Sequence, residues 1–436
     1  MMRSMFSGVS GLRAHQTRMD VIGNNVANVN TVAFKSGRVT FQEIFSQTLR
    51  GASAPDTLTG RGGTNPMQIG LGLGVGAVDT IMTRGSTQRT DNPTDMMIEG
   101  EGFFICRGGI NDTFKFTRAG NFTIDKLGNL VTGSGLNVYG WQRLKSDGSG
   151  EFDTESPIEP INLYSDAYRN KRIIPAKATS KIELAGNLDA SMVEAENEND
   201  PQADEIFTVP MTVYDKLGNN YKINLEFFKI EAGEEGTTWG WRIPEGTRYA
   251  VEVVEGEDTL EFGTDGILAT DPPTATIRFT PDEEMGTDGF DVTIDFSKLT
   301  MFAADNSVKP KSIDGYSSGN LVTFSVGPDG ILTGIYDNGQ QQSLGLIAIT
   351  SFENPAGLQK VGDNLYIPST NSGDYKPSKP GSNGTGTLNP GTLEMSNVDL
   401  SKEFTEMIIT QRGFQANSRI ITTSDEMLQE LVNLKR

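Results

Sequence analysis

The first 30 residues carry a regular stripe of apolar side chains. Met5, Leu12, Met19 and Val26 recur at every seventh position, and arginine, glutamine, threonine and asparagine occupy much of the surface between them. Apolar positions at this spacing lie along one face of an α-helix. The pattern predicts an amphipathic helix at the start of the chain.

The end of the chain repeats the same seven-residue step, from Leu400 to Leu428. Such a repeat stays on one seam only when helices wind around each other, so we expect the terminal helices to pair as an antiparallel coiled coil. A lone pair would leave apolar surface uncovered, so we also expect contacts with other copies. The residues expected in this helical core and its subunit interface are Met5, Leu12, Met19, Val26, Leu400, Phe404, Met407, Phe414, Ile421 and Leu428.

Local signals help to define these helices. Asp399 and Ser401 are suited to cap the C-terminal helix, with Glu403 in its first turn. Gly413 lies in mid-helix, where glycine costs about 1 kcal/mol relative to alanine, so we expect another backbone to pack closely there. At the other end, the asparagine-rich stretch at 23–30 predicts the end of the first helix and an ordered exit turn. By spacing alone, an ordinary helix end and loop explains that stretch.

Between the two ends the pattern is that of β-structure. Apolar residues alternate at 207–213 and at 221–227, and the turn sequence DKLGNN separates them, which predicts a β-hairpin. Val292, Ile294 and Phe296 alternate in the same way, and Trp239 and Trp241 share one face of a predicted strand. Tryptophans in that position favour a sheet core over a sugar-binding platform. The predicted fold class is α+β, mostly β.

Composition narrows the function. The formal net charge is −20, which repels phosphate backbones and anionic membranes, so nucleic acid is not an expected partner. One histidine, His15, and one cysteine, Cys106, leave little basis for a metal site, a disulfide or histidine-based catalysis. We find no set of nucleophile, base and orienting group. The chain is therefore not expected to be an enzyme or to carry a cofactor.

Two other patterns have simple structural explanations. GLGLGVGA at 70–77 contains a Gly-x-Gly-x-x-Ala spacing, but β-type residues follow it where a dinucleotide site requires a helix. The acidic runs at 194–200 and 281–289 lack the ligand spacing of an EF-hand and are expected to be solvated loops. Cys106 is expected to pack as a small apolar residue in a strand.

No export or membrane signal is evident. The N-terminal stretch lacks the continuous apolar segment and cleavage site of a secretory signal peptide. No apolar run approaches the roughly 18 residues that a membrane helix requires. We expect no membrane insertion, and either a cytoplasmic protein or one exported without a cleaved signal.

The segment MDVIGNNVANVNTVAFKS resembles the signature of the axial proteins of the bacterial flagellum, the rod and hook proteins. Ala33 stands where that family usually has glycine, so we expect a different local turn. LEMSNVDLSKEFTEMIITQRGFQANSRIITTSDEMLQELVNLKR resembles the family's C-terminal segment, and the stretches at 100–104, 117–131 and 343–366 resemble its β domain beside the helical core. The matching signature residues are Asn24, Asn25, Asn28, Asn30, Thr31, Phe34 and Lys35.

The resemblance implies a domain plan. Residues 1–70 and 392–436 would form the helical core with its Asn-rich linker, residues 71–150 and 316–391 a middle β domain, and residues 151–315 an outer β domain. Rod members generally lack such a large outer insertion, which favours a hook subunit over a distal rod subunit. Some spirochaete hook members carry a covalent link between a cysteine and a lysine; we cannot match Cys106 to the reacting position, and a cross-link through Cys106 stays an open alternative.

The implied function is that of a structural subunit. Copies would polymerise into a flexible, curved tube, a universal joint that transmits torque from motor and rod to the filament. The implied partners are further copies of the chain, the distal rod, hook-cap and hook-filament junction proteins, and the export apparatus. The implied location is the extracellular flagellum, reached without a cleaved signal peptide. The alternatives are a distal rod subunit, a secreted β-rich adhesin and a polysaccharide-cleaving enzyme with paired carboxylates in residues 151–315.

Overall fold

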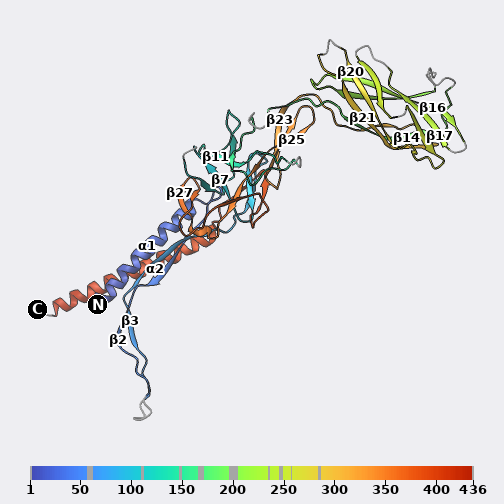
Figure 1. Cartoon of the computed structure of the whole chain (residues 1–436). Helices are drawn as coiled ribbons and strands as arrows, with labels where there is room; N and C mark the ends of the chain where they lie inside the picture. The colour runs from blue at the N-terminus through green and yellow to red at the C-terminus, as the bar shows by residue number, and fades with distance from the viewer. Residues whose placement is uncertain are drawn as a thin grey trace. The chain divides into compact units, whose positions relative to one another are not determined.

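The computed structural model describes residues 2–55, 62–109, 112–146, 150–164, 171–195, 205–233, 236–244, 249–256, 258–282 and 286–434. The chain forms two compact units. Unit 1 comprises Met1–Tyr164, Phe324–Thr333 and Ser343–Arg436, and unit 2 comprises Ser165–Thr323 and Gly334–Gln342. Long helices occur near both termini and strands make up most of the remainder (Figure 1). The predicted fold class, α+β and mostly β, is confirmed in this coarse form.

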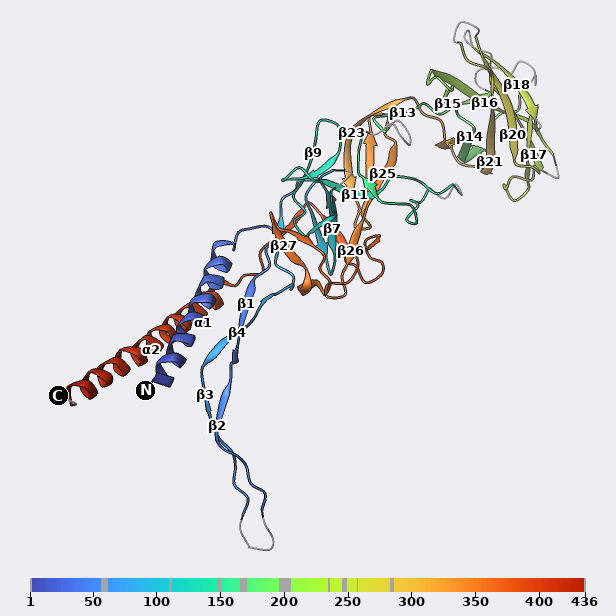
Figure 2. The ribbon, with the colours of Figure 1, turned by 60° about the vertical axis from the view of Figure 1, so that its left-hand side comes forward.

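Helices α1 (Met2–Ala27) and α2 (Leu400–Asn433) lie side by side and antiparallel in unit 1 (Figures 1 and 2). A Cβ built on Gly8 would lie 3.3 Å from Ile421, and Arg18 pairs with Glu406 at 2.6 Å. Asp399 caps α2 by accepting the Ser401 N–H at 2.9 Å, which confirms that predicted cap. Neither helix has a stretch long and apolar enough to span a bilayer.

A long two-stranded ribbon follows α1. Strand β1 (Gly37–Glu43) pairs antiparallel with β4 (Leu73–Thr80), and β2 (Ser46–Arg50) pairs antiparallel with β3 (Met67–Gly70). The glycine-rich sequence at 70–77 therefore belongs to the returning arm of this ribbon. The next described element is strand β5 (Thr87–Arg89) rather than a helix, so the requirement for a dinucleotide site is not met.

The rest of unit 1 is a β body. Its central strands are hydrogen-bonded in the order β25, β11, β7, β8, β28, β27, and its core packs Phe103, Phe116, Trp141 and Tyr366 together. The 3₁₀ turn η2 covers Pro355–Gly357. The strands are β6 (Met96–Glu99), β7 (Phe103–Arg107), β8 (Lys115–Thr117), β9 (Phe122–Ile124), β10 (Leu130–Thr132), β11 (Asn137–Trp141), β12 (Glu159–Pro160), β25 (Gln341–Ile347), β26 (Ile349–Ser351), β27 (Gln359–Gly362), β28 (Leu365–Ile367), β29 (Lys376–Ser378), β30 (Thr387–Pro390) and β31 (Thr392–Glu394).

Unit 2 contains two sheets around one apolar core. One sheet has the strand order β18, β20, β21, β14, β22 and the other has the order β15, β16, β17, β19. Strands β23 (Gly319–Val326), β24 (Ile331–Tyr336) and β25 include residues of both units. The other strands are β13 (Ile173–Ile174), β14 (Lys181–Asp189), β15 (Ile206–Tyr214), β16 (Asn220–Ala232), β17 (Gly236–Arg242), β18 (Tyr249–Glu255), β19 (Thr259–Gly263), β20 (Thr274–Pro281), β21 (Phe290–Phe302) and β22 (Lys309–Ile313).

The strand predictions for this unit are confirmed. Strands β15 and β16 form the predicted hairpin, with Val209 opposite Leu225 and Met211 opposite Ile223. The predicted strand at 292–296 lies within β21. Both tryptophans of β17 are buried in the core, as expected. The acidic runs at 194–200 and 281–289 lie partly outside the described residues.

One pentapeptide, DKLGN, occurs at 125–129 and again at 215–219, and it folds identically in both units. In each copy the aspartate accepts the backbone N–H groups of the leucine and asparagine, at 2.7 to 2.9 Å, and the asparagine amide donates back to it at 2.8 Å. The glycine has φ of 88° or 90°, a left-handed value that glycine adopts without strain. Local sequence is sufficient to specify this turn.

Candidate functional site

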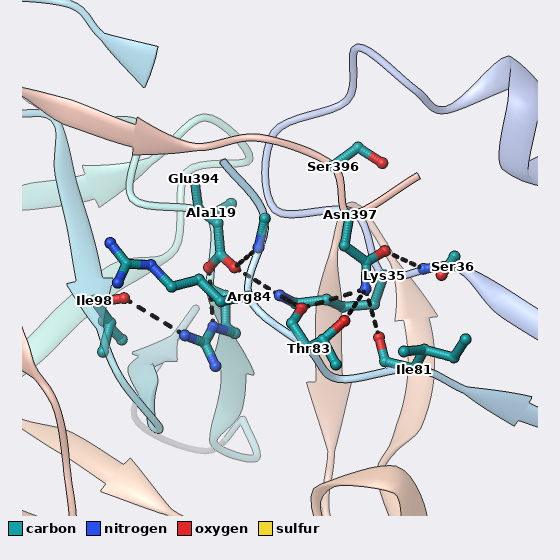
Figure 3. A network of polar contacts seen from close by, with 12 residues as sticks. Lys35, Ser36, Ile81, Thr83, Arg84, Ile98, Ala119, Glu394, Ser396 and Asn397 are labelled. Carbon is teal, nitrogen blue, oxygen red and sulfur yellow. Dashed lines mark hydrogen bonds and ion pairs between the residues drawn. The ribbon is translucent and has the colours of Figure 1, made fainter. Parts of the chain in front are cut away.

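Segments from both ends of the chain meet at the base of the β body. The stretch that leaves α1, the stretch after β4 and the stretch that leads into α2 run past one another and share a network of polar contacts (Figure 3). β31 pairs with β5, and β30 pairs with β6, which holds the chain before α2 against the chain after the ribbon. We call this network the junction.

The centre of the junction is a group of three charged side chains. Lys35 Nζ donates to Glu394 Oε1 at 2.6 Å, and Arg118 Nε donates to Glu394 Oε2 at 3.0 Å. Lys35 and Glu394 are fully buried, and Arg118 is 5% exposed. Lys35 also donates to the Thr83 carbonyl, and Arg118 donates to the Gly100 carbonyl. Because buried charges are tolerated only when paired and hydrogen-bonded, each member depends on the others.

The electrostatics keep Glu394 ionised. Burial acts to raise the pKa of Glu394, but Arg118 and Lys35 outweigh burial, and its pKa lies below the usual range. Burial lowers the pKa of Lys35, with the attraction of Glu394 opposing this change. Tyr366 is influenced by the same charges, and burial raises its pKa to about 12. At neutral pH the junction therefore contains one carboxylate shared by two basic side chains, beside a neutral phenol.

Asn397 makes a second connection in the junction. Its Oδ1 accepts the Ser36 N–H at 2.8 Å, and its Nδ2 donates to the carbonyls of Ile81 at 2.8 Å and Thr83 at 3.2 Å (Figure 3). A side-chain amide offers one acceptor and two donors, and here it uses both kinds. Asn397, three residues before the start of α2, is thus bound to the chain segments after α1 and after β4.

The Asn-rich signature organises the exit from α1. Asn25 is buried and makes two hydrogen bonds with Gly37 of β1, each 2.9 Å long. Asn28 Nδ2 donates to the Asn24 carbonyl at 2.9 Å, and Thr31 Oγ1 donates to Asn28 Oδ1 at 3.1 Å. The prediction that the stretch at 23–30 ends the first helix is confirmed, because α1 ends at Ala27. Two further signature residues are Phe34, which is buried under the Lys360 ammonium, and Asn30, which is exposed.

Ala33 adopts the conformation that glycine favours. Its φ is 57°, in the left-handed region, and its N–H donates to the Glu394 carbonyl at 2.7 Å. Alanine takes up this left-handed conformation at a cost of about 1–2 kcal/mol, and the expectation that the turn differs from that of the relatives stays a prediction. The bond to Glu394 and the burial of the Ala33 methyl oppose this cost.

Several of the most buried residues of α1 and α2 are small or polar. Gly8, Gly11 and Ala14 are buried in α1, and Thr410 and Ser424 are buried in α2. Small side chains let the two helices approach closely. Of the predicted residues, Met5, Leu12, Met19, Val26, Met407, Ile421 and Leu428 are partly buried, whereas Leu400, Phe404 and Phe414 are exposed.

Gly413 confirms the expected close approach but not its expected partner. A Cβ on Gly413 would lie 2.7 Å from the His15 ring, so a side chain, not a backbone, occupies the space. His15 also packs edge-on against Phe41 of β1 at 5.6 Å, and its Nδ1 is buried without a partner in the described part of the chain. Burial, followed by the charge of Arg18, lowers the pKa of His15.

Two candidate chemistries, a metal site and a reactive cysteine, find no support among the described residues. They contain no group of three or more histidine, cysteine, aspartate or glutamate side chains arranged to hold a metal. Cys106 lies in β7 with no exposed surface, and burial raises the pKa of its thiol to about 12. A thiol in this state does not form the thiolate that cysteine chemistry needs. The strand-packing role predicted for Cys106 is confirmed.

Sequence reasoning found Lys35 but missed Glu394, Arg118 and Asn397. Each of these lies far along the chain from its partner, and none follows an apolar period. The only local signal was Lys35 itself, a lysine in an otherwise weakly polar segment between two buried residues. A buried lysine requires an anion, but the sequence does not say which one.

The terminal helices, the ribbon and the junction are matched by known proteins. Family models of flagellar axial proteins match along the chain: "Flagella basal body rod protein" at residues 5–35, "Flagellar hook protein FlgE/F/G D1 domain" at 97–183, "Flagellar basal body protein FlaE D2 domain" at 187–316 and "Flagellar basal body rod FlgEFG protein C-terminal" at 389–434. The class is that of flagellar rod and hook proteins.

Curated relatives show to which family within this class the chain belongs. The chain is 39% identical to the flagellar hook protein FlgE of Borreliella burgdorferi and 38% identical to that of Treponema pallidum, in both cases over 100% of each chain. It is 32% identical to the flagellar basal-body rod protein FlgG of Bacillus subtilis, again over 100% of each chain. The chain belongs to the flagellar hook protein FlgE family. This is a family of structural proteins and not of enzymes.

A solved structure is also similar, the crystal structure of Helicobacter pylori flagellar hook protein FlgE2. It is 14% identical, with a TM-score of 0.37, over 69% of this chain and 99% of that one. At this TM-score we draw no inference from it about the arrangement of the units.

Proposed function

We propose that the chain is the structural subunit of a bacterial flagellar hook and polymerises into a flexible, curved tube. The tube acts as a universal joint that transmits torque from the motor and rod to the filament. The observation that carries this proposal is the large apolar surface that the terminal helices leave uncovered within one chain. Membership of the FlgE family supports it.

The uncovered surface lies mainly on α2. Fully burying a leucine, isoleucine or phenylalanine side chain contributes about 1.5–3 kcal/mol, so a row of such residues favours association strongly. Contiguous apolar surface of this kind marks an interaction site. The exposed large apolar residues of the two helices are Met2, Phe6, Val9, Leu400, Phe404, Ile408, Ile409, Phe414, Ile420, Met427, Leu431 and Val432.

The ribbon is a second region that lacks cover. Its outer part, β2 and β3, is a pair of strands, and isolated two-stranded hairpins are at best marginally stable in water. Leu49 and Met67 in this outer part, and Ile44 and Phe45 just before β2, are each at least half exposed. In the assembled tube these residues pack against neighbouring copies.

The finer architecture is part of the same proposal. Helices α1 and α2 pair as an antiparallel coiled coil in a core formed by residues 1–70 and 392–436. A middle β domain of residues 71–150 and 316–391 surrounds this core, and residues 151–315 form the outer domain. The predicted core residues, from Met5 to Leu428, make contacts between subunits. The distal rod, hook-cap and hook-filament junction proteins adjoin the tube. The chain reaches the flagellum through the export apparatus without a cleaved signal.

A distal rod subunit is the second candidate, because the FlgG relative also matches the whole chain. Unit 2 and the higher identity to hook proteins favour the hook. The two candidates predict different polymers: curved, flexible tubes for a hook and straight, stiff ones for a rod. Electron microscopy of the assembled protein separates them.

The test uses purified full-length chain at rising concentration, with assembly followed by sedimentation and electron microscopy. We expect curved tubes from the wild type and none from the Ile408→Asp/Ile409→Asp double variant. Leu217→Asp, which places a charge on an equally exposed residue of unit 2, is the matched control and should assemble normally. A wild-type chain that stays monomeric, or a double variant that assembles like the control, would exclude the proposal.

A further inference from the structure

A groove runs between α1 and the base of the ribbon. It has a volume of about 450 Å³ and is lined by Phe6, Val9 and Arg13 of α1 and by Ile44 and Val75 of the ribbon, among others. Its floor is fixed, because Ser10 Oγ accepts the Leu73 N–H at 3.3 Å. The groove follows α1 from Phe6 to Thr17, a length of about 16 Å at about 1.5 Å per residue.

The C-terminal turns of α2 extend past the start of α1. Gly8 faces Ile421 and His15 faces Gly413, so this register places Met2 opposite the turn around Glu426. The described residues that follow, up to Leu434, have no part of α1 opposite them, and both views show α2 continuing beyond α1 (Figures 1 and 2). This overhang is about two helical turns, or about 10 Å, long.

The overhang and the groove are complementary in shape and charge. Met427, Leu431 and Leu434 are four and three residues apart, so they form one exposed apolar stripe. Glu430 lies beside this stripe, and Arg13 lies beside the apolar lining of the groove. Neither charge makes an ion pair within the described residues. The negative end of the α2 dipole also favours a cation near the overhang.

We propose that the overhang of one copy inserts into the groove between α1 and the ribbon of a second copy. Met427, Leu431 and Leu434 then cover Phe6, Val9 and Ile44, while Glu430 pairs with Arg13. This inference rests on the proposed function, and it names one specific contact within the polymer. It accounts for three features at once: the open groove, the exposed stripe and the unpaired charges.

The occupant is another copy, because the chain cannot fill its own groove. Along the helix axis, Val9 is level with residue 419 of α2, so Leu431 of the same chain lies about 18 Å farther along the axis. A disulfide requires Cα atoms within about 7 Å of each other. A cysteine at each of these positions can therefore be joined only between copies.

The experiment uses the full-length Val9→Cys/Leu431→Cys variant, assembled and then oxidised. We expect a ladder of covalent multimers on a non-reducing gel, formed only in the assembled protein. The matched control is Leu127→Cys/Leu431→Cys, whose added cysteine is 71% exposed in a turn of unit 1 and should give no ladder. The native Cys106 is buried and does not take part.

A second set of variants decides the matter if the cysteine pair hinders assembly. Arg13→Glu and Glu430→Arg should each raise the critical concentration about two- to fivefold, as expected for a partly exposed ion pair, and the double reversal should restore it. Three outcomes would each overturn this contact and leave the hook function standing. They are tubes without a ladder, equal ladders in both cysteine pairs, and a critical concentration of the double reversal no lower than that of the single variants. A wild type that never assembles refutes the hook function itself.

Discussion

Replacing Glu394 with glutamine tests whether the junction holds the β body together. The substitution keeps the size of the side chain and removes the single anion that Lys35 and Arg118 share. Both cations then remain buried, with hydrogen bonds to carbonyls but no opposite charge. The destabilisation should therefore be centred on unit 1, which contains all three residues.

The magnitude follows from the charges. Removing one partner of a buried ion pair costs about 3–5 kcal/mol. The cost has an upper limit, because Lys35 can release its proton: neutralising a lysine with a pKa of about 10.4 at pH 7 costs about 5 kcal/mol. We expect Glu394→Gln to lower the free energy of unfolding of unit 1 by about 3–5 kcal/mol.

Native-state hydrogen exchange measures this change locally. Amides of β7 and β31 should exchange roughly 10²- to 10⁴-fold faster in the variant, while those of β16 and β21 in unit 2 serve as the internal reference. The control variant is Glu99→Gln, which breaks the exposed pair with Arg84 at 3.0 Å. That pair should contribute less than about 1 kcal/mol. Equal effects of the two substitutions would refute the structural role assigned to the junction.

Three further predictions concern single positions. Cys106 should resist maleimide in the native chain at pH 8 and react only after denaturation, because burial raises its pKa to about 12; prompt labelling would contradict its burial. Burial acts to raise the pKa of Asp314, but hydrogen bonds from Ser180, Lys181 and Lys177 outweigh burial and lower it. Asp314 therefore contributes stability above its ordinary pKa of about 3.9, and this stability is lost as the pH falls below that value. Urea unfolding of unit 2 at pH 7 and pH 3 should show this loss, and Asp314→Asn should reduce the difference. Gly413→Ala should destabilise the wild type by crowding His15, yet stabilise a His15→Ala chain by about 1 kcal/mol, as measured by thermal unfolding of the helices. A stability change of the same sign in both chains would rule out the contact.

Much of the fold follows from the sequence where structure is set locally. The alternation in β15 and β16, the DKLGN turns and the Asp399 cap depend on neighbours a few residues away. The existence of both helices was also predictable from the seven-residue step. The small residues that are fully buried in these helices were not, because hydropathy detects large apolar side chains, whereas close helix approach depends on small ones such as Gly8 and Thr410.

The junction was the least predictable part. Arg118 and Glu394 are ordinary charged residues in the sequence, and only the tertiary fold brings them to Lys35. The Ala33 turn shows the same limit. Alanine disfavours a left-handed backbone, but the hydrogen bond to β31 and the surrounding packing hold it in that conformation. Contacts formed across hundreds of residues override the local preference in both cases.

The ion pair between Lys35 and Glu394 spans 359 positions of sequence. Translation reaches the lysine and the arginine long before the carboxylate that neutralises them, so any fragment that stops short of β31 contains two cations that it cannot bury. Such a fragment fails at the base of the β body, whatever the quality of its remaining strands. The charge-paired, hydrogen-bonded junction therefore becomes complete only once the chain has been synthesised as far as β31.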